Sequence, residues 1–169
     1  NIFNIGCNII ENQEEFMTFL KSFSEFDGHK ILVHGGGKSA TELLLKLGIV
    51  PLMIQGRRIT DSETLEVVTM VYGGQVNKTI VAKLQALGIN ALGMSGADAN
   101  SIQAHKRPVT EIDYGFAGDV DGIDASILTS LLNLGLTPVF CALTHDQNGQ
   151  LLNTNADTIA SALAIGLSD

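Results

Sequence analysis

Cysteine is scarce in this sequence of 169 residues, where Cys7 and Cys141 are the only two. They stand far apart and form no CxxC pair, which excludes a disulfide framework and a cysteine-rich zinc site. We therefore expect a reducing, cytoplasmic setting. Long apolar runs are missing as well: no stretch of eighteen residues is apolar throughout, so no membrane-spanning helix is predicted. No basic and apolar leader is visible, and we expect no secretion signal.

Basic residues are also few, because ten Lys and Arg stand against eighteen Asp and Glu, for a net charge of −8. This balance argues against nucleic acid as a partner, since phosphate backbones are bound by basic faces. An anionic small molecule stays possible, because a pocket can be locally positive inside an acidic protein. With 45% apolar residues, three prolines, and no repeat or linker, residues 1–169 are predicted to form a single domain.

Strand-like and helix-like apolar patterns alternate along the chain. The predicted strands are residues 2–5, followed by a turn at Gly6, then 30–33, 90–94 and 137–143, with a hairpin over 102–120. The predicted helices are residues 12–26, 39–47, 62–72, 76–87, 124–134 and 156–165. Asn12 and Thr60 are expected to cap two of them, and Gly73-Gly74 to break the longest pattern. This alternation predicts an α/β fold: a three-layer αβα sandwich with a mainly parallel sheet and a β-hairpin excursion.

The strongest local feature is the segment His34-Gly35-Gly36-Gly37, which joins a strand to the start of a helix. Glycines allow backbone N–H groups to approach an anion closely, and a helix N-terminus adds partial positive charge. We therefore predict an anion-binding loop. A P-loop is excluded, because its first glycine would fall at Leu32, inside the strand.

A second motif overlaps this loop, since Gly35, Gly37 and Ala40 match the relaxed dinucleotide-binding fingerprint. An acidic ribose ligand should follow about twenty residues later, but Arg57 and Arg58 stand there instead. Arginine suits a 2′-phosphate, so an NADP-binding oxidoreductase domain stays open as an alternative.

Two polar segments are candidates for the same site. Arg57 and Arg58 precede a helix, and a guanidinium offers a planar fork for a carboxylate, although solvated surface arginines fit this pattern equally well. Residues 152–157, with the sequence LNTNAD, lie between a strand and a helix, where helix capping explains them as well as ligand binding does.

The remaining polar clusters carry no predicted chemistry. His34, His105 and His145 lack metal-ligand spacing, so no metal site is predicted. Asp119 and Asp121 are interpreted as a polar turn rather than as a carboxylate pair.

Taken together, five segments resemble the N-acetylglutamate kinase family of the amino acid kinase superfamily. They are HGGG (34–37), GRRIT (56–60), GGQVNK (73–78), YGFAGDV (114–120) and LNTNAD (152–157), in the family's order and spacing. The resemblance covers most of the chain and implies the acylglutamate-binding N-terminal portion, with the 102–120 hairpin as a lid-bearing region. It further implies transfer of the γ-phosphoryl group of ATP, with Mg²⁺, onto the side-chain carboxylate of N-acetylglutamate or N-succinylglutamate in arginine biosynthesis.

The resemblance also implies roles for single residues. Backbone donors to the phosphoryl group and the substrate come from Gly6, Gly35, Gly36 and Gly37; Arg58 clamps the substrate α-carboxylate; Asn153 and Asn155 bind the substrate; and Asp157 orients catalytic lysines. No general base is required, because the nucleophile is already an anion, so positioning and cations carry catalysis.

The first strand departs from the family pattern, which has a lysine followed by two glycines. Asn4, Gly6 and Cys7 stand at these positions. Asn4 brings no charge to the lysine position, and Cys7 places a side chain where backbone should approach phosphate. The family's C-terminal ATP-binding portion is absent from this chain, so we expect a part of a longer enzyme that is inactive alone.

Two hypotheses about the parent protein therefore stand beside the NADP alternative. It is an active acylglutamate kinase, or it is a catalytically impaired homologue that serves as a binding or dimerisation module.

A homodimer is predicted because the resembling kinases dimerise through this region, and because the helix at residues 62–72 is apolar around much of its circumference. The apolar side chains concerned are Leu65, Val67, Val68, Met70 and Val71.

Overall fold

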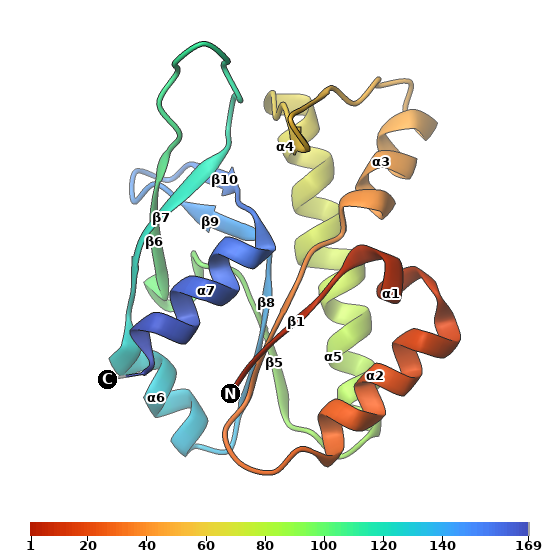
Figure 1. The fold of residues 1–169 in the computed structure, drawn as a ribbon, viewed down its shortest axis with the longest axis vertical. Helices are drawn as coiled ribbons and strands as arrows, with labels where there is room; N and C mark the ends of the chain where they lie inside the picture. The colour runs from red at the N-terminus through yellow and green to blue at the C-terminus, as the bar shows by residue number, and fades with distance from the viewer. Residues whose placement is uncertain (169) are drawn as a thin grey trace.

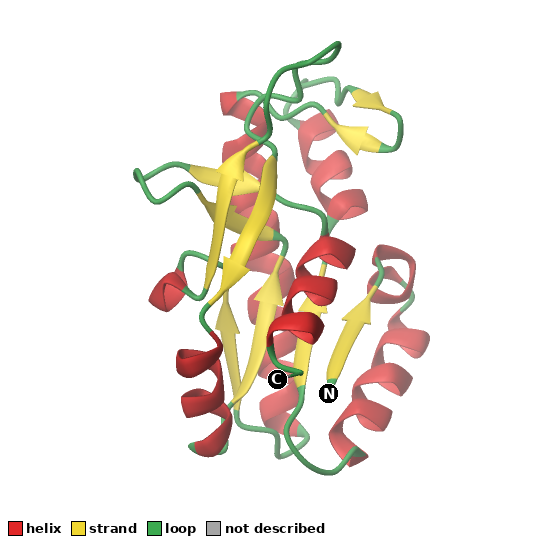
Figure 2. Ribbon diagram, turned by 60° about the vertical axis from the view of Figure 1, so that its left-hand side comes forward, coloured by secondary structure: helices red, strands yellow, loops and turns green. Residues whose placement is uncertain are grey.

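A four-stranded parallel sheet forms the centre of the molecule. The structure, a computed structural model, describes residues 1–168. The strands are β1 (Ile2–Ile5), β2 (Ile31–His34), β8 (Thr137–Cys141) and β5 (Ala91–Met94), and they lie in the order β1-β2-β8-β5. Every neighbouring pair is parallel. Figure 2 shows the four strands pointing the same way below a second four-stranded sheet. The predicted parallel sheet is confirmed.

Helices cover both faces of this sheet (Figure 1). One face packs against α2 (Gln13–Glu25), α3 (Gly37–Lys46), α4 (Ser62–Thr69) and α5 (Asn77–Ala86), and the other against α6 (Ala125–Asn133) and α7 (Ala156–Gly166). Strand β2 divides its side chains between the two cores, because successive side chains of a strand point to opposite faces. Leu32 belongs to the first core, whereas Ile31 and Val33 belong to the second. The three-layer prediction is therefore correct.

The second sheet carries the predicted hairpin. Its strands are β6 (Ile102–Lys106), β7 (Gly118–Ile123), β9 (Leu143–His145) and β10 (Leu151–Asn153), in the order β10-β9-β6-β7. Strands β6 and β7 pair antiparallel, as predicted. The single strand predicted over residues 137–143 is wrong, because β8 ends at Cys141 and β9 begins at Leu143 in the other sheet. A short hairpin of β3 (Met53–Ile54) and β4 (Arg57–Arg58) was not anticipated.

The helix starts follow the expected chemistry at one point and differ at two others. The Asn12 side chain accepts hydrogen bonds from the backbone of Glu14 and Glu15, which confirms it as a cap. The second cap is Asp61 rather than Thr60, since the Asp61 carboxylate accepts from the Thr64 backbone at 2.8 Å. The turn predicted after Gly6 is instead a short helix, α1 (Cys7–Glu11).

The longest helix does not break at its glycine pair. A π-helical segment, Met70–Val76, carries the chain from α4 into α5 without interruption. Val71 and Val76 are buried within it, and this packing outweighs the low helix propensity of Gly73 and Gly74. The predicted break is therefore wrong.

The argument for a dimer from this helix is also wrong. Leu65, Val67, Val68 and Val71 are all buried within the single chain, and Met70 alone of the five apolar side chains is exposed, at 55%. The helix therefore needs no second chain to cover it, and the prediction of a homodimer keeps only the family resemblance as its basis.

Among residues 1–168, no helix is long and apolar enough to cross a membrane.

Candidate functional site

A cavity of about 320 Å³ opens at the carboxyl ends of β1, β2 and β8. This edge of a parallel sheet is where ligands of α/β proteins are commonly bound. All nine residues that the sequence proposed for the site line this cavity: Asn4, Gly6, Gly35, Gly36, Gly37, Arg58, Asn153, Asn155 and Asp157. The helices α3 and α7 also begin here, at Gly37 and Ala156, so their positive ends face the same space.

The glycine loop is held tightly from two sides. A Cβ atom at Gly36 would lie 2.7 Å from Cδ1 of Tyr72, so this position has to be glycine because of a neighbouring ring, not because of its backbone angles. On the other side, the backbone N–H of Gly37 donates to Sγ of Cys7 at 3.2 Å. One of the donors predicted to face an anion is therefore occupied by a thiol.

Arg58 is buried beside this loop and is only partly paired. Its Nη2 donates to the carbonyl of Gly37 at 2.8 Å and to the hydroxyl of Thr41 at 2.9 Å. Its Nη1 is buried and has no hydrogen-bond partner among residues 1–168. A buried, unpaired guanidinium nitrogen is costly, and an anionic oxygen in the cavity would satisfy it. Arg57, its neighbour on β4, is exposed, because successive residues of a strand face opposite ways.

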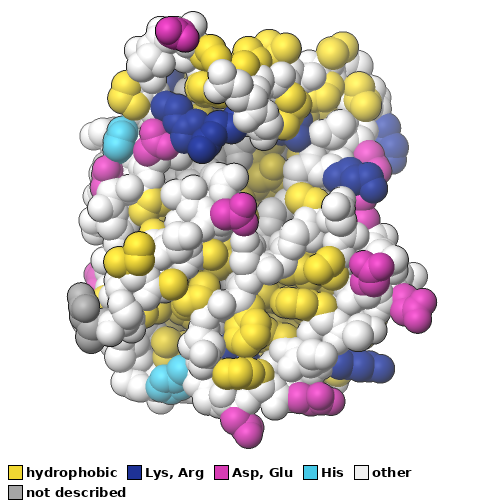
Figure 3. All heavy atoms as spheres, in the orientation of Figure 1, with side chains coloured by type: hydrophobic (Ala, Val, Ile, Leu, Met, Phe, Trp, Pro, Cys, Tyr) yellow, Lys and Arg dark blue, Asp and Glu magenta, His cyan; other side chains and the backbone are white. Residues whose placement is uncertain are grey.

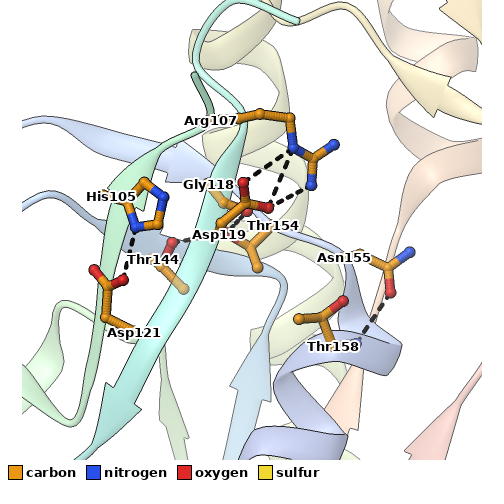
Figure 4. Close-up of polar contacts among 9 residues, drawn as sticks. All are labelled: His105, Arg107, Gly118, Asp119, Asp121, Thr144, Thr154, Asn155 and Thr158. Atoms are coloured by element: carbon orange, nitrogen blue, oxygen red, sulfur yellow. Dashed lines mark hydrogen bonds and ion pairs between the residues drawn. The ribbon is translucent and has the colours of Figure 1, made fainter. Parts of the chain in front are cut away.

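The LNTNAD segment contributes through both backbone geometry and side chains. Asn155 caps α7, with its Oδ1 accepting from the Thr158 backbone at 3.1 Å (Figure 4), so the capping explanation is correct for this residue. Nδ2 of Asn153 donates to the Thr60 hydroxyl at 3.1 Å. The Asp157 carboxylate accepts from Nδ2 of Asn4 at 2.5 Å, which joins the start of α7 to the end of β1. Both partners of this last contact are exposed, at the open side of the cavity.

Arg107, which the sequence did not single out, also lines the cavity. Its Nη2 donates to the Asp119 carboxylate at 2.5 Å and its Nε at 3.2 Å (Figure 4). These hydrogen bonds hold the pKa of Asp119 below its usual value. Figure 3 shows Lys and Arg side chains gathered beside the hairpin in the upper part of this face. Three guanidinium groups, from Arg57, Arg58 and Arg107, thus surround a cavity in an acidic protein.

The predicted polar turn at Asp119 and Asp121 is wrong, because both residues lie on strand β7. Asp119 pairs with Arg107. The Asp121 carboxylate accepts a hydrogen bond from Nδ1 of His105 at 2.7 Å (Figure 4). Each carboxylate thus has a hydrogen-bond partner on the hairpin. Among residues 1–168, no three His, Cys, Asp or Glu side chains are placed to hold a metal ion.

His34 anchors the start of the glycine loop, although the sequence assigned it no role. It is fully buried, with Nδ1 at 2.7 Å from the carbonyl of Gly35 and Nε2 at 2.9 Å from Nδ2 of Asn77. Asn77 also donates to the carbonyl of Val139 at 3.0 Å, which joins the long helix to β8. Burial lowers the pKa of His34 to about 4. The ring is therefore neutral, donating through Nδ1 and accepting at Nε2.

Because the pKa of His34 is lowered in the folded state, we predict that the free energy of unfolding falls in mild acid. The pKa of this histidine is about 4 when folded and about 6.5 when unfolded, so protons bind preferentially to the unfolded chain between these values. The contribution is fully present above pH 6.5 and falls by about 3 kcal/mol as the pH is lowered towards 4. Urea unfolding at several pH values measures it. His34→Gln should flatten the pH dependence in this window, and His29→Gln, at an exposed position, should leave it unchanged. Equal slopes in native protein and His34→Gln would contradict the assignment.

Comparisons with known proteins agree with this geometry. The model of the amino acid kinase family matches residues 2–168. The chain is 56% identical over 167 residues to the acetylglutamate kinase of Bacteroides thetaiotaomicron, covering 99% of the chain and 65% of that protein. It is 57% identical over 167 residues to the acetylglutamate kinase of Cytophaga hutchinsonii, covering 98% of the chain and 63% of that protein. The chain thus spans about 65% of the length of the curated relatives that it matches.

Among solved structures, the N-acetylglutamate synthase of Neisseria gonorrhoeae, in complex with coenzyme A and N-acetylglutamate, superposes with a TM-score of 0.83. The sequence identity is 20%, and the match covers 98% of this chain and 38% of that one. At this identity the similarity concerns the fold alone.

Proposed function

Because the chain belongs to the amino acid kinase family, we propose that the whole protein is an acetylglutamate kinase, which phosphorylates the side-chain carboxylate of N-acetylglutamate with ATP. The observation that carries this proposal is the buried Nη1 of Arg58, which lacks a partner among residues 1–168 and lies at a cavity bordered by a glycine loop. A substrate α-carboxylate supplies the missing acceptor. The relatives named acetylglutamate kinase support the choice of substrate.

The residues present suit a reaction that depends on positioning. A carboxylate nucleophile needs no base, so the site has to hold two anions close together and stabilise the transferring group. Arg58 binds the substrate beside Gly37, at the start of α3, and Gly35 and Gly36 bring backbone to the same cavity. Asn153 is held by Thr60 at the wall of the cavity, where its amide contacts the substrate. Asp157 orients its neighbours from the first turn of α7.

The nucleotide is assigned to the part of the protein that this chain does not include. ATP supplies the phosphoryl group in this family, and we propose that Mg²⁺ accompanies it. N-Succinylglutamate is the second acyl substrate proposed, because Arg57 adds positive charge to the cavity lining, whereas Arg107 is paired with Asp119. A cytoplasmic location, from the two unpaired cysteines, and a homodimer, from the family resemblance, complete the proposal.

A second candidate function is favoured by one observation. The Gly37 N–H donates to Cys7, and Asn4, at the family's lysine position, is uncharged and contacts Asp157, so the cavity offers a phosphoryl group one backbone donor and one cation fewer than the family pattern does. A protein with this site could bind acylglutamate while transferring phosphate slowly. It would then act as a binding or dimerisation module.

Two measurements test the proposed function. Calorimetric titration of this chain should show binding of N-acetylglutamate and none of useful affinity for MgATP or NADP⁺. In the full-length protein, hydroxylamine trapping of the acyl phosphate should report ATP-dependent turnover of N-acetylglutamate. Tight MgATP binding by this chain alone, or NADP⁺ binding, would overturn the assignment of the cavity. Acylglutamate binding without turnover would select the binding module.

A further inference from the structure

Tyr72 lies deep in the wall of the cavity, on the π-helical segment of the long helix. It is 6% exposed, and its ring packs directly on the glycine loop, since a Cβ atom at Gly36 would lie 3.0 Å from Cε1. The hydroxyl reaches further, to 3.8 Å from the corresponding point at Gly37. The side chain thus crosses beneath the loop and ends beside the residue that starts α3.

The Tyr72 hydroxyl and the Arg58 guanidinium meet at Gly37. Nη2 of Arg58 lies 4.0 Å from the same Cβ position that the hydroxyl approaches to 3.8 Å. Burial raises the pKa of the Tyr72 phenol, and the positive charge of Arg58 opposes this rise in part. The phenol is therefore protonated at neutral pH and can donate a hydrogen bond.

The surroundings of the hydroxyl do not account for a tyrosine at this position. Val71 and Val76 on the same segment are buried and apolar. The Arg58 guanidinium lies beside the Tyr72 hydroxyl and can only donate, so the phenol proton is free for an acceptor in the cavity. The Arg58 nitrogen Nη1 has the same need, because it is buried without a partner among residues 1–168. Two hydrogen-bond donors at one end of a cavity call for a single anionic acceptor with two oxygens.

We propose that Tyr72 is a substrate-binding residue, whose hydroxyl donates to the α-carboxylate that Arg58 receives. The ring of Tyr72 holds Gly36 in place, while the hydroxyl and Nη1 of Arg58 each contact one carboxylate oxygen. The inference rests on the proposed function, since it takes acylglutamate as the ligand. It adds a second residue that binds the α-carboxylate, and this residue comes from the π-helical segment.

The test separates the hydroxyl from the ring, and the carboxylate from the rest of the ligand. Tyr72→Phe keeps the ring against Gly36 and removes only the hydroxyl. N-Acetylglutamate and 4-acetamidobutanoate share the acetamido group and the reacting carboxylate, but the second lacks the α-carboxylate. Calorimetric or competitive titration of the full-length protein with both ligands gives four dissociation constants. Thermal unfolding without ligand shows whether the variant keeps the native fold.

We expect Tyr72→Phe to weaken N-acetylglutamate binding about tenfold or more, as for a lost hydrogen bond to a charged group. Binding of 4-acetamidobutanoate should change less than about twofold. An equal loss for both ligands, or no loss for either, would overturn the proposal while leaving the proposed function intact. If the native protein bound neither ligand, the proposed function would fail as well, so the two failures are distinguishable.

Discussion

Asn4→Lys combined with Cys7→Gly is expected to accelerate phosphoryl transfer by the full-length protein about 10²- to 10³-fold. The lysine would place a cation beside Asp157, where Nδ2 of Asn4 now lies 2.5 Å from the carboxylate. The glycine would remove the thiol that accepts the Gly37 N–H and return that donor to the cavity. Both changes act on the charge that builds up on the transferring group. Steady-state kinetics on native and variant protein measures the effect.

Controls for this experiment lie on the same short segment. Asn8→Lys adds the same charge at an exposed position of α1 that does not line the cavity, and it should not change the rate. Acylglutamate affinity should change little in the double variant, because Arg58 is untouched. If the native protein already turns over as fast as the double variant, another cation serves the phosphoryl group, and Asn4 is not a defect.

Arg58→Ala is expected to weaken N-acetylglutamate binding by about 2–4 kcal/mol, or roughly 30- to 1,000-fold. Arg58 is 8% exposed, and its Nη1 has no partner among residues 1–168, so a bound carboxylate would meet it with little competition from water. Arg57→Ala removes the same charge from an exposed neighbour and should cost far less. Calorimetry on the two variants measures the difference.

Loss of the Arg58 side chain also removes its bonds to the glycine loop and to α3. Thr41→Val deletes the acceptor of one of these bonds and leaves the guanidinium in the cavity. If Thr41→Val weakens binding as much as Arg58→Ala does, Arg58 acts by holding the loop rather than by contacting the ligand. If Arg57→Ala matches Arg58→Ala, the wrong arginine was assigned to the carboxylate.

Periodicity was sufficient to predict the layers of this fold, because strands and helices bury their side chains with different repeats. The β2 strand is apolar on both faces and reads as a central strand, which is where it lies. Local propensity gave the wrong prediction where tertiary packing determines whether a helix continues. Gly73 and Gly74 look like a break, yet the buried side chains around them keep the helix continuous. Nothing local to residues 137–143 shows that the chain passes from one sheet to another at Ala142.

The site divides in the same way. The glycine loop and Arg58 carry their chemistry in the sequence, as a strand, a turn and a charged fork at recognisable spacing. Spacing alone does not separate Arg58 from Arg57, and the family resemblance made that choice. The physical difference lies in β4, which pairs with β3, buries Arg58 and exposes Arg57. Arg107 and Tyr72 reach the cavity from distant elements. No motif or spacing in the sequence indicates that either residue belongs to the site. His34 gave one signal that could have been used, since it is a polar residue at the end of a strand that is otherwise apolar.

The π-helical segment sets the angle between two contacts to the glycine loop. Tyr72 contacts Gly36 and Asn77 is hydrogen-bonded to His34, although the two residues are five positions apart on the helix. On a regular α-helix, positions five apart point about 140° away from each other, so both could not face one loop. The i to i+5 hydrogen bonding of a π-helix puts more residues into each turn, so such positions come closer to the same side of the helix. The extra residue in this turn therefore changes the direction in which the following side chains point. A chain one residue shorter here would keep its helix but lose either the Tyr72 contact with Gly36 or the Asn77 contact with His34.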